Sequence, residues 1–139
     1  MGKVLVEATI ANLTDLYNAK DGLIPDNQVR SVNVADALVD TGATNLSLPA
    51  GMIEKLGLHC LGNRRARTGA GTIEMRVFGT ARVTVQGRDC ACDVTEVPDG
   101  SPVLIGQIPL EVMDFVIDMQ GRKLTGNPEH GGEQMIEHY

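Results

Sequence analysis

The chain has 139 residues, which is the size of one domain with a single hydrophobic core. Its formal net charge is −6, its lysines and arginines form no continuous stripe, and it contains no tryptophan, so we expect no nucleic-acid partner. No stretch is long and apolar enough to cross a bilayer, and residues 1–3 lead into a strand pattern instead of a signal-peptide core. We therefore expect a cytoplasmic protein without a membrane partner.

The N-terminal part of the chain predicts strands that lead to an acidic loop. Residues 4–10 alternate between apolar and polar side chains, which is the pattern of a half-buried strand. Turn-forming residues at 21–27 separate this strand from a second one at 29–34. The apolar run 37–39 then ends at Asp40, so this carboxylate follows directly after a strand.

Asp40 begins a short loop that continues with Thr41, Gly42 and Ala43. An acid followed by a small hydroxyl residue and a glycine lies on a tight turn, where backbone amides can reach the carboxylate. The loop is therefore a candidate site for chemistry. The alternative is that Asp40 only caps a turn after the strand, which is a common use of these residue types.

A helix and a hairpin are expected next. Pro49 is tolerated in a first helical turn, and the apolar residues at 52, 53 and 56 precede Gly57, which predicts a short helix ending there. A glycine-rich hairpin tip follows at Gly69, Ala70 and Gly71, where small residues permit large backbone changes.

In the middle of the chain, apolar side chains recur at every second position. This pattern predicts three strands of a meander at 73–77, 81–85 and 90–94, with a break at Gly79 and a turn at 86–88. Short strands with turns between them favour a small, closed all-β domain.

An apolar element closes the domain. The run Val103 to Ile105 predicts a buried strand, and Gly106 separates it from a helical stretch that begins near Ile108. We expect residues 111–114 to be helical and residues 115–117 to form the final strand. The whole chain then has one or two short helices.

In this order the elements resemble a retropepsin-like aspartic protease, the retroviral type of acid protease, over about Val32 to Asp118. The resemblance rests on the Asp-Thr-Gly loop, the segment from Leu48 to Leu58, the glycine-rich hairpin, the meander and the apolar-apolar-Gly element at 104–106. It implies an all-β acid-protease barrel at 1–125 and a C-terminal tail at 126–139. It also implies a hydrolase, an aspartic endopeptidase that cleaves a protein or peptide substrate and requires no cofactor.

The active unit of that family pairs two Asp-Thr-Gly loops, whereas this chain has one and no internal repeat. We therefore expect a homodimer in which Asp40 meets Asp40 of a second copy near a two-fold axis. The two carboxylates would share one proton, so that one activates water while the other donates a proton to the substrate carbonyl.

The resemblance also assigns supporting roles around this catalytic aspartate. Thr41 would hydrogen-bond across the dimer axis, Gly42 would position substrate through its backbone, and Ala43 would place an amide near the carboxylate. The apolar-apolar-Gly element would pack beneath the loop, with its glycine allowing close approach: Leu104, Ile105 and Gly106.

The hairpin tip at Gly69, Ala70 and Gly71 would be the flap that closes over substrate, and an ordinary hairpin turn is the alternative. Three arginines precede the tip: Arg64, Arg65 and Arg67. They could contact an acidic substrate, but we favour a solvated strand face, where charged runs more often lie.

Two positions depart from the viral members, which usually carry an Asp after the Ala of the loop and an Arg after the distal Gly. Thr44 and Gln107 occupy these positions here. The resemblance is therefore closer to the cellular and bacterial members.

No cysteine or histidine has zinc-like spacing, so we expect no metal site, and we expect Cys90 and Cys92 to be buried, reduced thiols.

Two rival interpretations stay open at this point. The first is a non-catalytic dimeric peptide-binding or assembly module with the same fold. The second treats Asp40 as a plain turn residue in an unrelated β-barrel and predicts no dimer.

Overall fold

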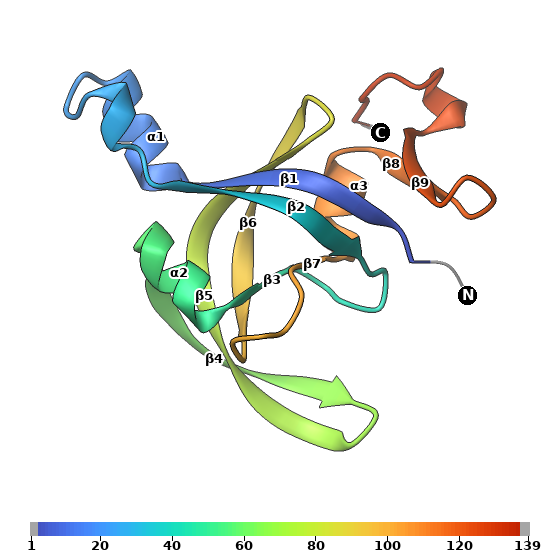
Figure 1. Cartoon of the computed structure of the whole chain (residues 1–139), viewed down its shortest axis with the longest axis horizontal. Coiled ribbons are helices and arrows are strands. Elements are labelled where there is room, and N and C mark those ends of the chain that lie inside the picture. The colour runs from blue at the N-terminus through green and yellow to red at the C-terminus, as the bar shows by residue number, and fades with distance from the viewer. Residues whose placement is uncertain (1–2, 137–139) are drawn as a thin grey trace.

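The computed structural model describes residues 3–136 and consists mainly of strands (Figure 1). The strands are β1 (Leu5–Asn12), β2 (Ser31–Val39), β3 (Leu46–Pro49), β4 (His59–Thr68), β5 (Gly71–Val85), β6 (Arg88–Val97), β7 (Leu104–Ile105), β8 (Phe115–Asp118) and β9 (Lys123–Gly126). The helices are α1 (Leu13–Lys20), α2 (Ala50–Leu56) and α3 (Gln107–Val112), with short 3₁₀ turns at Asp26–Gln28 and Pro128–His130. The predicted all-β class is therefore confirmed.

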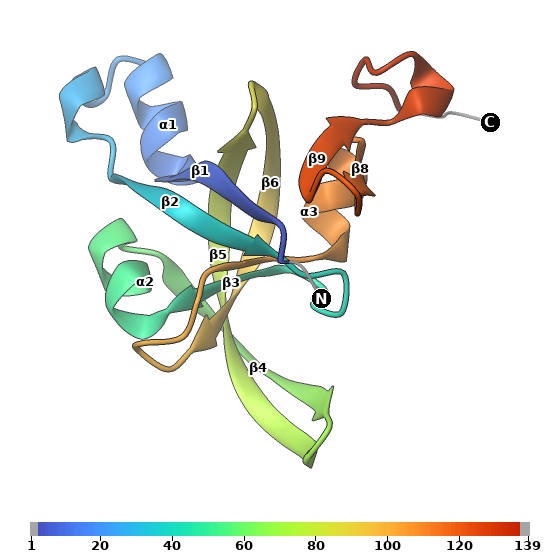
Figure 2. The same ribbon diagram turned by 45° about the vertical axis from the view of Figure 1, so that its right-hand side comes forward.

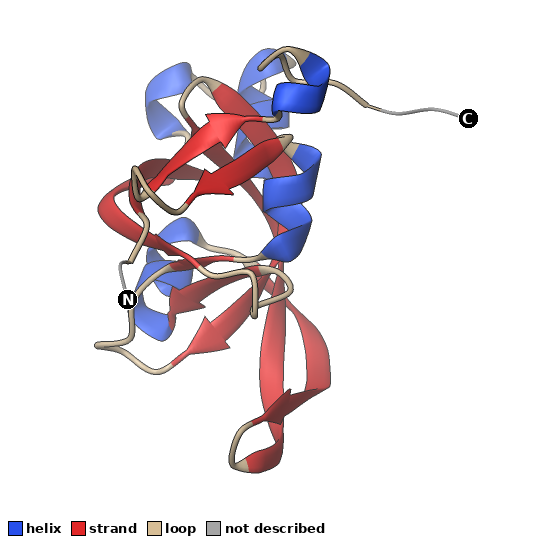
Figure 3. Ribbon diagram, turned by 90° about the vertical axis from the view of Figure 1, so that its right-hand side faces the viewer, coloured by secondary structure: helices blue, strands red, loops and turns tan. Residues whose placement is uncertain are grey.

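Six strands close into a ring. They are hydrogen-bonded in the order β1-β2-β7-β3-β6-β5, and β5 pairs back onto β1. β4 pairs only with β5, so the β4–β5 hairpin extends away from the ring, as all three ribbon views show (Figures 1, 2 and 3). The sheet is therefore a closed ring of six strands from which the β4–β5 hairpin protrudes.

The strand register brings the two motifs of the sequence together. β2 runs parallel to β7, with Leu38 opposite Leu104 and Val39 opposite Ile105. β3 pairs with the other edge of β7, with Leu46 opposite Ile105. The ends of β2 and β7, and the loops that follow them, therefore lie side by side.

The core fills the inside of the ring. It is built from aliphatic side chains at alternate positions of the strands, and fully buried members include Ile10, Leu46, Leu48, Val83, Val94 and Ile105. Leu56 of α2 and Met113, which follows α3, are also fully buried. Burying a side chain of this size contributes roughly 1.5–3 kcal/mol. This core holds β7 fixed beneath the loop that follows β2.

α2 confirms the predicted helix. It ends at Gly57, which has the left-handed conformation with φ of 64° that glycine adopts without strain.

α1 was not predicted, and it brings the number of α-helices in residues 3–136 to three instead of one or two. Asn12 caps it, since its side chain accepts a hydrogen bond from the Asp15 amide at 3.0 Å. The Asp15 carboxylate then binds Arg30 through two side-chain hydrogen bonds of 2.8 and 3.0 Å. A distant arginine thus stabilises a helix whose own sequence is weakly amphipathic.

Three boundaries also differ from the predictions. The expected break at Gly79 is a bulge within one continuous strand, β5, because the pairing with β6 shifts between Phe78 and Ala81 without ending. The helix near the C-terminal end is α3, and Asp114 lies outside it with φ of 59°. β8 is not the final strand, because it pairs with β9.

The segment after β9 folds back onto Asp114. The His130 ring lies 2.6 Å from the Asp114 carboxylate, and the Asn127 side chain and the Met135 amide donate to it at 3.2 and 3.1 Å. Arg88 donates to the carbonyls of Met113 and Asp114 at 2.9 and 2.8 Å. The hydrogen bond with His130 lowers the pKa of Asp114, and burial opposes this change.

None of the helices in the described part of the chain is both long enough and apolar enough to span a bilayer.

Candidate functional site

Backbone hydrogen bonds from two directions position Asp40. Its amide donates to the Ile105 carbonyl at 2.9 Å, which continues the β2–β7 pairing by one residue. The preceding amides of Leu38 and Val39 donate to Val103 and Val4 at 2.8 and 2.9 Å. The chain on both sides of β2 therefore fixes the point from which the carboxylate projects.

The loop then turns back onto its own carboxylate. The Gly42 amide donates to Oδ1 of Asp40 at 2.9 Å, and the Ala43 amide donates to the Asp40 carbonyl at 3.1 Å. A Cβ at Gly42 would lie 3.1 Å from Oδ1, so a larger residue would crowd this contact. Asp40 is half-buried, while Thr41 and Gly42 are exposed. One carboxylate oxygen is thus held by an amide at a site that solvent can reach.

Gly106 packs against this loop more closely than any other residue could. Its amide donates to Asn45 at 3.0 Å, and the next amide, of Gln107, donates to Ala43 at 2.8 Å. A Cβ at Gly106 would lie 2.4 Å from the Asn45 carbonyl oxygen and 2.6 Å from that of Ala43. These backbone oxygens cannot rotate away, so the site requires glycine.

The apolar part of the same element supports the loop from beneath. Ile105 is fully buried, and Leu104 is half-buried. The structure therefore brings together the two segments that the sequence separates by about 60 residues, at 40–43 and 104–106.

A cleft of about 550 Å³ opens above Asp40. The loop contributes Asp40, Gly42 and Ala43, and Leu104 lies beside them. The opposite wall is the β4 arm of the hairpin, from Arg64 to Thr68. The cleft thus lies between the acidic loop and the hairpin.

Not every predicted site residue lines this cleft. Thr41 lies on the exposed turn next to it, and Ile105 and Gly106 lie buried beneath it. Gly69, Ala70 and Gly71 lie beyond the lined part of the hairpin and are exposed.

The hairpin tip has an open turn built around glycines. The Thr68 hydroxyl donates to the Gly71 carbonyl at 2.8 Å and accepts from the Ala70 amide at 3.2 Å. Gly71 has φ of 114°, a conformation that other residues rarely adopt, and no atom lies within 4 Å of where a Cβ would stand at Gly69 or Gly71. Space around the tip is therefore free for a change of backbone conformation.

The apolar wall of the cleft was not predicted from the sequence. Met75 and Val77 of β5 line it together with Val97 of β6. The alternation of β5 places Met75 and Val77 on one face, and that signal was visible. Which face turns toward Asp40 depends on the twist of the hairpin, which the alternation does not give.

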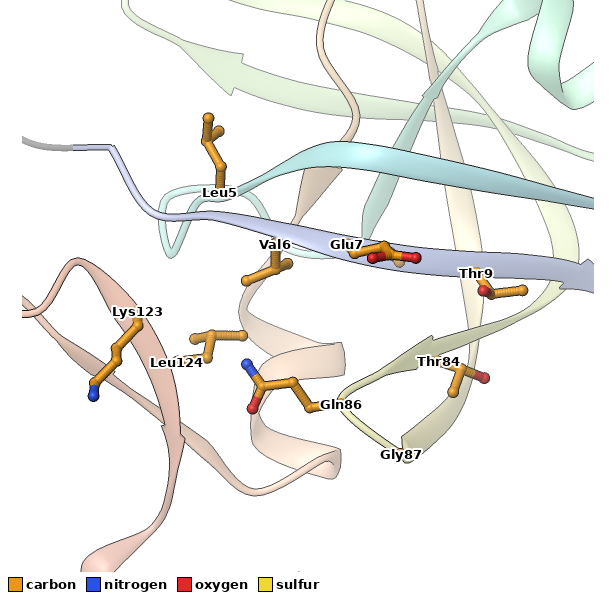
Figure 4. A pocket seen from close by; sticks show the side chains of 10 residues that line it. Leu5, Val6, Glu7, Thr9, Thr84, Gln86, Gly87, Lys123 and Leu124 are labelled. Carbon is orange, nitrogen blue, oxygen red and sulfur yellow. The ribbon is translucent and has the colours of Figure 1, made fainter.

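A second hollow, of about 520 Å³, lies between β1, the β5–β6 turn and β9 (Figure 4). Of its described lining residues, Glu7 and Lys123 alone are charged, and they project from different strands. This hollow has no pair of acidic groups and no motif from the sequence.

Thiol and metal chemistry have little support in the described part of the chain. Cys90 and Cys92 are buried free thiols, as predicted, and Cys60 is an exposed one. The hydrogen bond with Cys90 and burial raise the pKa of Cys92, so it stays protonated. Within residues 3–136, no three histidine, cysteine, aspartate or glutamate side chains are grouped so that they could hold a metal ion.

Comparison with known families agrees with the motifs. The model of the family described as "gag-polyprotein putative aspartyl protease" matches residues 28–111, which is more than half of the chain. The match begins before β2 and ends within α3, so it includes the acidic loop, the hairpin and Gly106. A search of the curated proteins found no match.

Proposed function

Since the chain belongs to the family of gag-polyprotein aspartyl proteases, we propose that it is an aspartic endopeptidase with Asp40 as its catalytic residue. The main support for this proposal is the position of the Asp40 carboxylate. It lies at the base of a cleft of about 550 Å³, with one oxygen held by the Gly42 amide at 2.9 Å. A carboxylate held in this way can accept a proton from water that attacks a peptide carbonyl.

Hydrolysis in this way requires a second carboxylate, which we propose comes from a second copy of the chain. Asp40 is the only acidic residue that lines the cleft within residues 3–136. Two carboxylates about 4 Å apart repel by about 4 kcal/mol at an effective dielectric constant of 20, which is roughly 3 pK units. The pair would therefore hold one proton, so that one member is the base and the other the acid.

The surface around the loop supports such a dimer. Thr41 and Gly42 are exposed, so a symmetry mate could approach them. Ile108, whose amide donates to Thr44 at 2.9 Å, is 43% exposed although it is a large apolar residue. Leu5, which lies opposite Leu38 on β2, is 52% exposed. A two-fold interface centred on Asp40 would cover apolar side chains of this kind.

We also propose that the hairpin is the flap. Its β4 arm forms one wall of the cleft, and its tip has the free space that a closing movement needs. Closure would exclude bulk water from the carboxylate pair and add backbone hydrogen bonds to the substrate.

The closer relation to cellular and bacterial members stays a proposal that rests on two residues. The Gln107 side chain donates to Glu111 at 2.6 Å, within its own helix, and Thr44 is exposed. Neither position can form the ion pair that the viral members usually have. The cytoplasmic location likewise stays a prediction, which fractionation of cells that produce the chain would test.

The decisive experiment compares wild type with Asp40→Asn on a mixed peptide library from acidic to neutral pH. Asparagine has nearly the same size and can keep the hydrogen bond from Gly42, so the variant should fold and dimerise. We expect wild type to cleave with a bell-shaped pH profile and an acidic optimum, and the variant to show no cleavage.

Sedimentation of both proteins is the control, and activity per chain should fall on dilution. Cleavage by Asp40→Asn at the wild-type rate would contradict the proposal. Folded dimers of both proteins that bind peptides without cleaving them would instead favour the non-catalytic peptide-binding module.

A further inference from the structure

Three arginines of the β4 arm are among the residues that line the cleft. Arg64, Arg65 and Arg67 all line it, and all three are exposed. Among the described lining residues Asp40 is the only one with a negative charge, so arginines outnumber acidic residues at the cleft. The chain as a whole has a net charge of −6, so the cleft differs in sign from the rest of the protein.

The register of the hairpin shows which arginine faces the cleft. Directly opposed residues on paired strands lie on the same face of a sheet. Arg64 lies opposite Met75, while Gly62 lies opposite Val77. Met75 is half-buried, Val77 is buried, and both line the cleft. Arg64 therefore lies on the same face of the hairpin as Met75 and Val77, which line the cleft, whereas Arg65 and Arg67 lie at the alternate positions of β4, on the other face.

These arginines have no carboxylate partner in the part of the chain that the structure describes. The ion pairs within residues 3–136 use other cations, and the Arg64 side chain donates only to the neighbouring Asn63 carbonyl at 3.1 Å. Arg76, on the same hairpin but on the opposite face, binds Glu96 with two hydrogen bonds of 2.9 and 2.7 Å. On the outer face Arg76 thus has a carboxylate partner from β6, whereas no described carboxylate pairs with Arg64.

We propose, on the basis of the proposed endopeptidase function, that the cleft selects peptides with an aspartate or glutamate close to the scissile bond, and that Arg64 is the specificity-determining contact. A guanidinium binds a carboxylate through two parallel hydrogen bonds, which gives direction as well as attraction. Met75 and Val77 provide an apolar wall next to it. The substrate is therefore an acidic peptide with an apolar residue beside the acidic one.

A nucleic acid is the rival polyanion, and the lining of the cleft argues against it. Single-stranded nucleic acids bind where aromatic side chains stack on the bases. No aromatic residue is present among the described lining residues.

The test uses three labelled peptides of equal length that share an apolar centre and carry glutamate, glutamine or lysine beside it. Cleavage by wild type is measured as kcat/KM, and binding to Asp40→Asn is measured by fluorescence anisotropy. We expect the glutamate peptide to be preferred in both assays. The preference should shrink when salt rises from about 0.05 to about 0.5 M, because the contact is exposed to solvent.

Arg64→Gln should reduce cleavage and binding of the glutamate peptide by about two- to fivefold, the range of one exposed ion pair, and leave the glutamine peptide unchanged. Arg64→Lys keeps the positive charge but loses the two parallel hydrogen bonds of the guanidinium, so its cleavage and binding of the glutamate peptide should lie between those of wild type and Arg64→Gln. Arg122→Gln is the matched control. It removes the same charge from the β8–β9 turn, far from the hairpin (Figure 1), and should change nothing.

The outcomes separate this inference from the endopeptidase function. Equal cleavage of all three peptides would overturn the acidic preference and leave the endopeptidase intact. Tighter, Arg64-dependent binding of the glutamate peptide without cleavage would support the preference and overturn the endopeptidase. An equal loss in Arg122→Gln would overturn the role of Arg64. A labelled single-stranded oligonucleotide that binds more tightly than the glutamate peptide, through Arg64, would overturn the choice of a peptide.

Discussion

Replacing Gly106 by alanine tests whether the contact between the two motifs holds the candidate site together. The new Cβ would stand 2.4 Å from the Asn45 carbonyl oxygen and 2.6 Å from that of Ala43. Both oxygens belong to the backbone and accept hydrogen bonds of 3.0 and 2.8 Å from the same strand-to-helix connection. The clash can therefore be relieved only by moving the loop that carries Asp40.

The cost follows from these contacts. Overpacking of a filled interior costs about 1–3 kcal/mol, and each of the two hydrogen bonds contributes about 1 kcal/mol more if it is lengthened or lost. We expect Gly106→Ala to reduce the free energy of unfolding by about 3 kcal/mol, which is a large part of the roughly 5–15 kcal/mol of a typical domain. Cleavage should fall as well, because Ala43 moves with the loop.

The assay is urea denaturation at one protein concentration, since a dimer makes the midpoint depend on concentration. Gly69→Ala is the matched control, because no atom lies within 4 Å of its added Cβ. This control should change stability by less than about 0.5 kcal/mol. A Gly106→Ala protein as stable as the Gly69→Ala control would show that the close contact at Gly106 does not hold the Asp40 loop in place.

Three further predictions concern the hairpin tip, the helix cap and the C-terminal segment. Gly71→Val should lower kcat more than it lowers the free energy of unfolding, because valine resists the φ of 114° at the tip. Unchanged cleavage by the folded variant would show that this hairpin is not the flap. Asn12→Ala should lower the free energy of unfolding by about 2–4 kcal/mol, because it removes the cap of α1 and leaves the buried Leu56 carbonyl without its 2.8 Å donor. Urea denaturation measures this change, and a loss below about 1 kcal/mol would contradict the prediction. The pKa of Asp114 is lowered by His130, so the folded state binds fewer protons than the unfolded state, and stability should fall as pH drops through and below the ordinary value of 3.8. Asp114→Asn should flatten that fall in acid denaturation, and an unchanged slope would remove Asp114 from the explanation.

Local chemistry made much of the fold predictable. The helix before Gly57 was predicted correctly because capping and apolar spacing act within a few residues. The all-β class followed from a period of two that persists along the chain, and the resemblance to the protease family is confirmed by the family match over residues 28–111. The catalytic role of Asp40 stays a prediction.

The missed elements depend on partners far along the chain. α1 is stabilised by Arg30, which lies 15 residues from its partner Asp15. β5 continues through Gly79 because β6 pairs with it on both sides of the bulge. A window of local sequence contains neither partner, so residues 13–20 received no predicted element and Gly79 was predicted to be a break.

Three features of the site could be read from the residues alone: an acid follows a strand, a glycine follows a second strand, and a hairpin has a tip of small residues. The fold adds the contacts between these features: it brings the carbonyls of Ala43 and Asn45 against Gly106, and it places Arg64 and Asp40 in the lining of one cleft. Backbone preferences are set by near neighbours, whereas the side of a cleft that a side chain faces is set by strand pairing and twist across the whole ring.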